Sequence, residues 1–238
     1  MRILKFLLIT IIICANYTCF NKCKSFKEGK NQIYGIDISH YQDNKSQIDW
    51  QVVSKNTNPY ITFAYIRTTM GKDGIDKAFK YNFYEAQKNG IKVGVYHYYR
   101  PNENAKEQFD NFFNNTPEIG DMPPVLDIED IGNLGTRRLK NELTKFLTLL
   151  KEKYNTDPII YAPQKFYNIY LRGEFSEYRI WIARHNGIQN PPESNEMKNE
   201  PFLIDRRCPL IWQYSGTGRV NGISGDVDLN IAKQEIWN

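Results

Sequence analysis

Cysteine is scarce in this 238-residue chain, and its placement restricts the chemistry available to the folded part. Three of the four cysteines, Cys14, Cys19 and Cys23, fall within the first 23 residues, so Cys208 is alone in the remainder. If the first 23 residues are removed, Cys208 has no partner in the chain. We therefore expect no disulfide within the folded domain and no zinc site built from thiolates.

Long apolar runs are also absent, apart from one near the start. A short basic beginning (Met1, Arg2, Lys5) precedes the run FLLITIIICA at residues 6–15. This run is too short to span a bilayer comfortably and is typical of the apolar region of a secretory signal. We expect residues 1–23 to be a signal peptide or a membrane or lipoprotein anchor, and the protein to be exported to the cell envelope or beyond it.

A surplus of basic charge is missing once that segment is set aside. Removing residues 1–23 takes away Arg2, Lys5 and Lys22 and no acid, which leaves 28 basic side chains against 27 acidic ones. Nucleic-acid binding requires a concentrated basic surface, so this balance gives it little support and we expect no nucleic-acid partner.

From residue 32 onward, short apolar runs alternate with longer amphipathic segments. Strands are expected near residues 34–38, 60–67, 92–98, 124–128, 159–161, 179–183, 210–214 and 227–229, and helices over 49–55, 76–88, 105–114 and 137–154. The alternation predicts an α/β fold, a mostly parallel sheet with helices outside, and eight strands favour a closed barrel. We expect a polar tether at 24–31 and one barrel domain at 32–238, with fewer helices in its second half.

The segment PPVLDIED, residues 123–130, places acids where a buried strand would normally carry apolar residues. Successive side chains of a strand point to opposite faces, so Asp127 and Glu129 share a face, which in a barrel is the interior at the carboxyl end. Carboxylates that share a buried face repel each other and lose hydration. The alternative is that Glu129 and Asp130 only cap the next segment, and the octapeptide alone does not decide between the two.

Two further strands bring an acid to the same end of the predicted barrel. Asp37 follows the apolar run YGI, and Asp228 lies within VDL. Because this rim collects residues from several strands, the acids can form one cluster that binds a metal or cleaves a glycosidic bond. Cleavage needs one protonated and one ionised carboxyl, and a separation of about 5–5.5 Å favours retention of configuration. Glu129, which reaches further, is the expected donor and Asp127 the ionised partner.

Aromatic and amide side chains accompany the acids at the strand ends. Sugar rings present apolar C–H faces that stack on aromatic rings, although core packing is the better explanation for any single aromatic. The candidate substrate-binding residues are Tyr65, Tyr98, Tyr161, Trp212 and Gln42. Trp212 and Tyr214 share one strand face and Gln213 occupies the other, so only one of these faces can line a groove.

Taken together, these motifs resemble glycoside hydrolase family 25, the lysozymes of Chalaropsis type, from about Tyr34 to Ile231. GIDISHYQ is similar to the opening strand of that family, FAYIRTTMG to its second strand and NFYEAQKNGIKVGVYHYYRP to the passage into its third. VLDIED carries an Asp-x-Glu pair, IIYAP and IWIAR resemble later strands, and LIWQYSGTGRVNGISGDVDLN resembles the closing segment. One departure is Met70, since the family often has Thr-Glu-Gly where this chain has Thr-Met-Gly.

The resemblance implies an irregular (β/α)5(β)3 barrel, related to the TIM barrel, in a single domain. It also implies a muramidase that cuts the β-1,4 bond between N-acetylmuramic acid and N-acetylglucosamine in peptidoglycan glycan strands, with no metal or cofactor. We expect a monomer, and no feature of the sequence implies a protein partner. Glu129 would be the acid/base and Asp127 its partner, with Asp37 and Asp228 as supporting carboxylates. Whether Asp127 attacks directly or steadies an oxazolinium formed by the substrate stays open.

Three other functions compete with this one. A chitinase-like hydrolase usually carries another acid four residues before the catalytic glutamate, where this chain has Val125. A metal-dependent hydrolase could use the acid cluster, but the three histidines (His40, His97, His185) lack ligand spacing such as H-x-x-x-H. A barrel that binds chitin-type oligosaccharides without cleaving them has no need of intact carboxylates, although their presence does not exclude it.

Overall fold

The computed structural model of the chain describes residues 25–26, 32–43, 46–185, 187 and 199–237. The expected signal or anchor segment, residues 1–23, and most of the expected tether lie outside these residues. Within the described ranges, no helix combines the length and the hydropathy that crossing a membrane requires.

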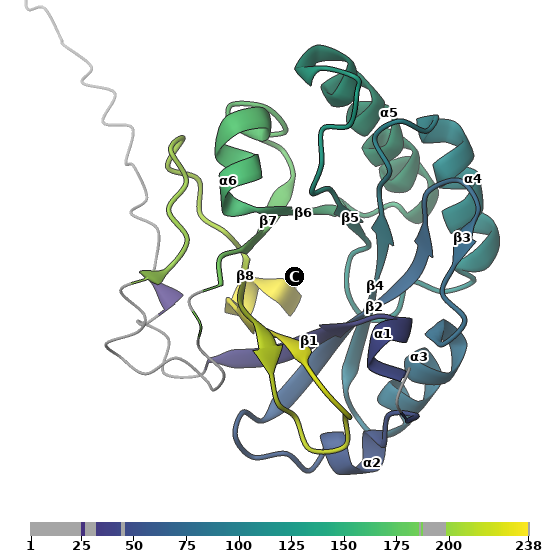
Figure 1. Cartoon of the computed structure of the whole chain (residues 1–238), viewed down its shortest axis with the longest axis vertical. Coiled ribbons are helices and arrows are strands. Elements are labelled where there is room, and N and C mark those ends of the chain that lie inside the picture. Colours follow the sequence, from purple (N-terminus) through teal and green to yellow (C-terminus); the bar gives the residue numbers. More distant parts are fainter. Residues whose placement is uncertain (1–24, 27–31, 44–45, 186, 188–198, 238) are drawn as a thin grey trace, which may run out of the picture.

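Eight strands close into a barrel whose helices lie on the outside (Figure 1). The strands are β1 (Ile33–Ile38), β2 (Ile61–Met70), β4 (Lys92–Tyr98), β5 (Val125–Asp127), β6 (Ile159–Pro163), β7 (Arg179–Ala183), β8 (Ile211–Gly218) and β9 (Val227–Ala232). Neighbours in the barrel follow the order β1-β9-β8-β7-β6-β5-β4-β2, and pairing of β1 with β2 completes the ring. A two-residue strand, β3 (Gly74–Ile75), extends the sheet beside β2.

Helices follow the first five barrel strands. They are α1 (His40–Asp43) and α2 (Trp50–Val53) after β1, α3 (Phe79–Lys88) after β2, α4 (Ala105–Asn115) after β4, α5 (Thr136–Tyr154) after β5, and α6 (Gln164–Phe166) with the π-helix η2 (Tyr167–Leu171) after β6. The structure describes no α-helix between β7 and β9, and a 3-10 turn, η4 (Gln234–Trp237), follows β9. The expected (β/α)5(β)3 arrangement is confirmed.

The last strand runs against the others. From β1 around through β2 to β8, every barrel pairing is parallel, whereas β9 is antiparallel to both β8 and β1. The beginning of β9 therefore lies at the rim where the other strands end. This geometry places Asp228, the second residue of β9, opposite Asp37 near the end of β1.

Two apolar layers support the barrel. The buried stripe of α5 (Leu139, Leu143, Phe146, Leu147, Leu150) packs against the outer face of the sheet, as its spacing predicts. A second cluster, which includes Phe63, Tyr65, Val125, Ile159 and Trp181, fills the interior. Gly94 of β4 makes room for the Tyr65 ring, because a Cβ at position 94 would lie 2.3 Å from its Cε1 atom.

The helix expected over 76–88 begins later, at Phe79, and Asp76 lies in the segment that leads into it. Its carboxylate accepts hydrogen bonds from the backbone N–H groups of His40 and Ala78 and pairs with Arg67. Asp76 thus connects the turn before α3 with the segment after β1.

Two observations bear on the expectations for the start of the domain. Cys208 is disulfide-bonded, whereas the sequence predicted that it has no partner once residues 1–23 are removed. That prediction assumed that residues 1–23 are removed, and they carry the only other cysteines of the chain. Phe26, within the expected polar tether, is buried against Trp212 with the ring centroids 5.9 Å apart, and its N–H donates to Glu200 Oε2 at 2.9 Å. This part of the tether packs on the barrel.

The contact between α5 and β4 gives a test of the packing. The Phe146 ring stacks on His97 of β4, with centroids 4.9 Å apart, and it is fully buried. We expect Phe146→Ala to lower the free energy of unfolding by about 3–5 kcal/mol, because it removes buried surface and leaves a cavity. Urea denaturation would measure this, with the exposed α5 residue Glu152 changed to Ala as the control. Equal stabilities for the two variants would contradict the assigned packing.

Candidate active site

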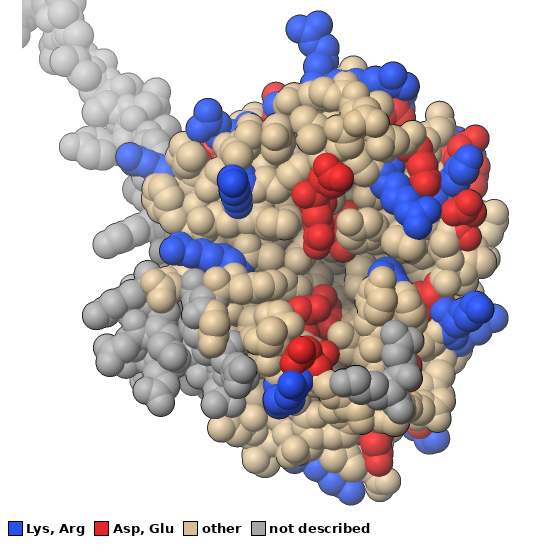
Figure 2. Space-filling model, in the orientation of Figure 1, with Lys and Arg blue, Asp and Glu red and all other residues tan. Residues whose placement is uncertain are grey.

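A cleft of about 270 Å³ opens at the carboxyl rim of the barrel, and all four predicted acids line it. Asp37 comes from β1, Asp127 from β5 and Asp228 from β9, and Glu129 follows β5 by two residues. Figure 2 shows acidic side chains gathered around a hollow near the centre of this face. Positions separated by up to 191 residues in the chain thus meet in one place.

Strand register accounts for the meeting. Asp37 of β1 pairs with Asp228 of β9, so these two residues lie side by side at the rim. On the opposite wall, Tyr98, Asp127 and Tyr161 form a row across β4, β5 and β6. The row places the two tyrosines on either side of Asp127.

The Asp37 carboxylate is held by two amide side chains. Its Oδ2 atom accepts hydrogen bonds from Gln213 Nε2 and Asn230 Nδ2, both at 2.8 Å. Trp181 Nε1 donates in turn to Asn230 Oδ1 at 2.9 Å, which fixes the orientation of that amide. Asp37, Gln213 and Asn230 are all buried, so the position of this carboxylate is set by the protein.

The same network fixes a histidine at the cleft. Gln213 Nε2 donates to Asp37, so the other end of this amide, Gln213 Oε1, must act as an acceptor. It accepts from the Tyr161 hydroxyl at 2.9 Å and from His185 Nε2 at 2.7 Å. His185 Nε2 must then carry a proton, whether the ring is neutral or charged. The histidine lies two residues beyond the end of β7 and lines the cleft.

Asp127 and Glu129 differ in exposure although they share a face. Asp127 is 7% exposed, and its Oδ1 atom has no hydrogen-bond partner among the described residues. Glu129 is exposed at the mouth of the cleft. The cleft therefore offers one inner carboxyl with an unused oxygen and one outer carboxyl that a bound molecule can reach.

Burial raises the pKa of every acid in the cluster. It raises the pKa of Asp228 to about 8, with the charges of Asp37 and Glu129 acting in the same direction. It raises that of Asp37 to about 6, even though the hydrogen bonds from Asn230 and Gln213 oppose the rise. Since the groups also repel one another, they cannot all be ionised at neutral pH and must retain protons.

The two central acids follow the same rule. Burial, followed by the charges of Glu129 and Asp37, raises the pKa of Asp127 well above its ordinary value, and the Arg67 charge opposes this. Glu129 is exposed as a residue, but its partial enclosure by the cleft also raises its pKa, whereas the nearby Tyr161 hydroxyl and the charge of His185 lower it. Carboxyls that keep protons near neutral pH beside others that can ionise are the combination that acid/base catalysis requires.

Three of the five predicted substrate-binding residues line the cleft: Tyr98, Tyr161 and Gln42. Gln42 also joins two rim segments, since its Oε1 accepts from the Ser39 N–H and its Nε2 donates to the Asp226 carbonyl. The other two lie elsewhere. Tyr65 is buried inside the barrel and donates to the Pro123 carbonyl, so the structure does not support a role for it in sugar binding.

Trp212 is also buried, in the layer outside the sheet, where its Nε1 donates to the Arg184 carbonyl at 3.0 Å. The face of β8 that reaches the cleft is the one that carries Gln213. The assignment of Trp212 to sugar binding is therefore not supported. Tyr96 and Trp181 are the aromatic side chains that line the cleft in addition to Tyr41, Tyr98 and Tyr161.

Sequence reasoning missed His185, Asn230 and Tyr41. His185 lies two residues beyond a predicted strand, and this position could have identified it as a site residue, because the strand ends form the site in such barrels. Asn230 shares a strand face with Asp228, so alternation along β9 could have indicated it. No comparable signal existed for Tyr41, which lies on the short helix α1 and is 64% exposed.

The family model for Glycosyl hydrolases family 25 matches residues 36–223. Lysozyme M1 of Streptomyces globisporus is 32% identical over 212 residues, which cover 83% of this chain and 67% of that protein. The Escherichia coli K12 protein YegX is 34% identical over 202 residues, covering 84% and 69% of the two chains.

Solved structures give the same result. A family 25 glycosyl hydrolase from Bacillus anthracis aligns with a TM-score of 0.70 at 28% identity, over 85% of this chain and 90% of that one. The bacterial lysozyme from Streptomyces coelicolor aligns with a TM-score of 0.67 at 30% identity, over 85% and 92% of the two chains. The closed barrel, the acid cluster at its rim and these matches lead to one conclusion: the chain belongs to glycosyl hydrolase family 25.

Proposed function

We propose that this protein is a lysozyme that hydrolyses the β-1,4 bond between N-acetylmuramic acid and N-acetylglucosamine in peptidoglycan. The observation that carries the proposal is the meeting of Asp37, Asp127, Glu129 and Asp228 in one cleft where burial raises every pKa. Family membership and the similarity to lysozymes support the substrate.

Glu129 is the proton donor in this proposal. It is exposed at the mouth of the cleft, where a glycosidic oxygen can approach it, and its raised pKa keeps it protonated at a higher pH than an ordinary glutamate. Donation of this proton to the leaving oxygen avoids the expulsion of an unstable alkoxide. The same group then removes a proton from the incoming water.

Asp127 is the partner that meets the positive charge developing on the sugar. Without substrate its burial favours the protonated form, but a cationic centre beside it favours the carboxylate, as the Arg67 charge already does. Its unused Oδ1 atom suits either attack on the anomeric carbon or a hydrogen bond from the acetamido N–H of the substrate. Both routes retain the configuration of the sugar.

We also propose that the protein acts outside the cytoplasm. Disulfides persist in oxidising compartments and are rare in the cytosol, so the bonded state of Cys208 supports export. Since the only other cysteines are at positions 14, 19 and 23, cleavage after residue 23 would separate Cys208 from all of them. An anchored segment, or cleavage further upstream, is compatible with a disulfide inside the chain.

The proton-donor assignment predicts the effect of Glu129→Gln. We expect the release of reducing sugar from purified peptidoglycan to fall at least about a thousandfold, because the amide cannot donate an acidic proton, while the Tm changes little. The control is Glu118→Gln, an exposed glutamate before β5 that does not line the cleft. Near wild-type turnover by Glu129→Gln would refute the assignment.

The proposed bond specificity predicts the products. Digested peptidoglycan that is reduced with borohydride and analysed by mass spectrometry should carry muramitol at the new reducing ends. Ends that carry glucosaminitol would indicate a glucosaminidase, and free peptides would indicate an amidase. Either of those results would overturn the proposed function while leaving the family unchanged.

The raised pKa of Asp228 predicts a pH-dependent stability. The folded state holds this proton up to about pH 8, whereas the unfolded chain releases it near pH ~3.9, so the stability falls as the pH rises through that window. Asp228→Asn removes this loss. We expect the Tm of the variant relative to wild type to rise by several degrees between pH 4 and pH 8, with Asp73→Asn, an exposed aspartate, showing no such rise. A pH-independent difference would argue against a buried proton on Asp228.

A further inference from the structure

A second pocket, of about 640 Å³, lies beside the catalytic cleft and is separated from it by α1. Tyr41 and Gln42 of this helix line the cleft, whereas His40 and Asp43 line the second pocket. Arg67 borders both, so the two spaces meet at its guanidinium group. The volume is within the range of about 300–1,000 Å³ that is typical of ligand sites.

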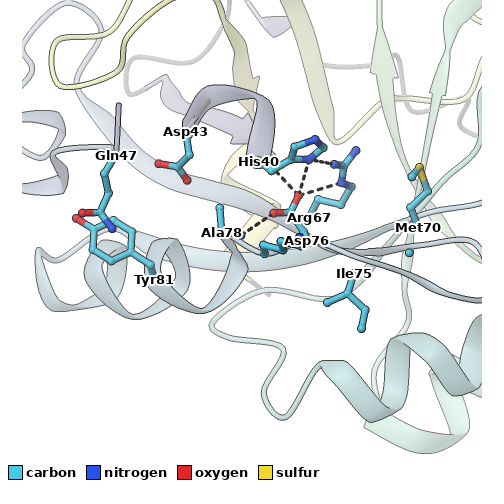
Figure 3. Close-up of a pocket in the computed structure, with 11 residues that line it drawn as sticks. His40, Asp43, Gln47, Arg67, Met70, Ile75, Asp76, Ala78 and Tyr81 are labelled. Carbon is cyan, nitrogen blue, oxygen red and sulfur yellow. Dashed lines mark hydrogen bonds and ion pairs between the residues drawn. The ribbon is translucent and has the colours of Figure 1, made fainter. Parts of the chain in front are cut away.

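The wall between the two spaces is rigidly built (Figure 3). Asp76 Oδ2 accepts hydrogen bonds from the His40 N–H at 2.8 Å and from Arg67 Nε at 3.1 Å, and Asp76 Oδ1 accepts from the Ala78 N–H at 3.1 Å. The Asp76 side chain is 1% exposed. The charges of Arg67 and Asp76 therefore compensate each other and hold the wall in place.

Two charged groups of the pocket are not compensated in this way. Lys77 is exposed, and among the described residues it makes no hydrogen bond or ion pair. The Asp43 carboxylate accepts only from neutral donors, the Ile48 N–H and the Asn82 amide. A ligand that enters thus meets one cation and one anion that lack an ionic partner.

Most of the remaining lining is apolar. Met70 and Ile75 lie on one side, and the ring of Tyr81 lies on the other next to the Gln47 amide (Figure 3). Ile75 is 56% exposed, so its side chain is accessible to a ligand. The pocket therefore combines opposite charges with small apolar surfaces.

We propose that this pocket binds the peptide branch carried by the muramic acid residue of the strand that the cleft cuts. That branch is a short peptide with carboxylates, often a free amine, and small apolar side chains, which matches the lining group by group. A neutral N-acetylglucosamine chain has no charge for Lys77 or Asp43 to recognise. The inference rests on the proposed function, and it makes the peptide part of substrate recognition.

Comparison of two substrates tests the proposal. Glycan strands with intact peptides and the same strands stripped by an amidase are supplied to wild type and to Lys77→Ala, Lys77→Glu and Lys77→Arg. We expect wild type to prefer the peptide-bearing strands in kcat/KM, and Lys77→Ala to lose about three- to tenfold on them with little change on stripped strands. Lys77→Glu should lose more and Lys77→Arg less.

A lysine elsewhere provides the matched control. Lys165→Ala, on α6, removes an exposed amine that does not line the pocket, and it should leave both rates unchanged. Equal wild-type rates on the two substrates, or a Lys77→Ala variant with unchanged rates on both, would overturn the peptide site while leaving the glycosidase intact.

Failure of the proposed function would give a different result, since wild type would then release muramic-acid ends from neither substrate. In that case, isothermal titration calorimetry tests the peptide site by comparing the affinity of Glu129→Gln for a disaccharide-peptide with its affinity for the disaccharide alone. Tighter binding of the peptide form that Lys77→Ala abolishes supports the site, and equal binding of the two ligands overturns it.

Discussion

The concentration of carboxyl groups at one rim of the barrel is the constraint on which the rest of the structure depends. Burying an acid is unfavourable unless it is hydrogen-bonded, paired or protonated, and this protein uses all three solutions. Asp37 receives two amide hydrogen bonds, the buried Asp76 beside the cleft forms an ion pair with Arg67, and Asp228 keeps its proton to about pH 8. The barrel core, with α5 packed against it, provides the stability that such a cluster costs.

The antiparallel last strand contributes directly to this arrangement. In a fully parallel barrel, the second residue of the final strand would lie at the opposite rim, away from the other acids. Reversal of β9 brings Asp228 opposite Asp37 and also brings Asn230 opposite Gln213. One change of strand direction thus supplies both an acid and one of the amides that hold Asp37.

Most strands and helices, and the shared face of the two central acids, could be predicted from the sequence, because the spacing of apolar residues along a strand or a helix is a local property. All eight barrel strands were expected near their observed places, and the shared face of Asp127 and Glu129 followed from alternation alone. The choice between the two faces of β8 was not local. Trp212 and Gln213 alternate, and only the closed barrel shows that Gln213 faces the cleft. Phe26, from a segment that reads as a polar tether, covers Trp212 on the other side.

Arg67 connects the two halves of the substrate-binding surface. The Arg67 charge near Asp127 favours the carboxylate form that the reaction needs. Without an ionic partner, the guanidinium would lower the pKa of Asp127 further and could move toward another anion. The ion pair with Asp76 limits both effects, and Asp76 is itself held by the backbone of His40 and Ala78. The turn between β2 and α3 therefore sets the electrostatics of the cleft while its outer surface lines the second pocket. Recognition of a branch there and ionisation of Asp127 therefore rely on the same guanidinium group.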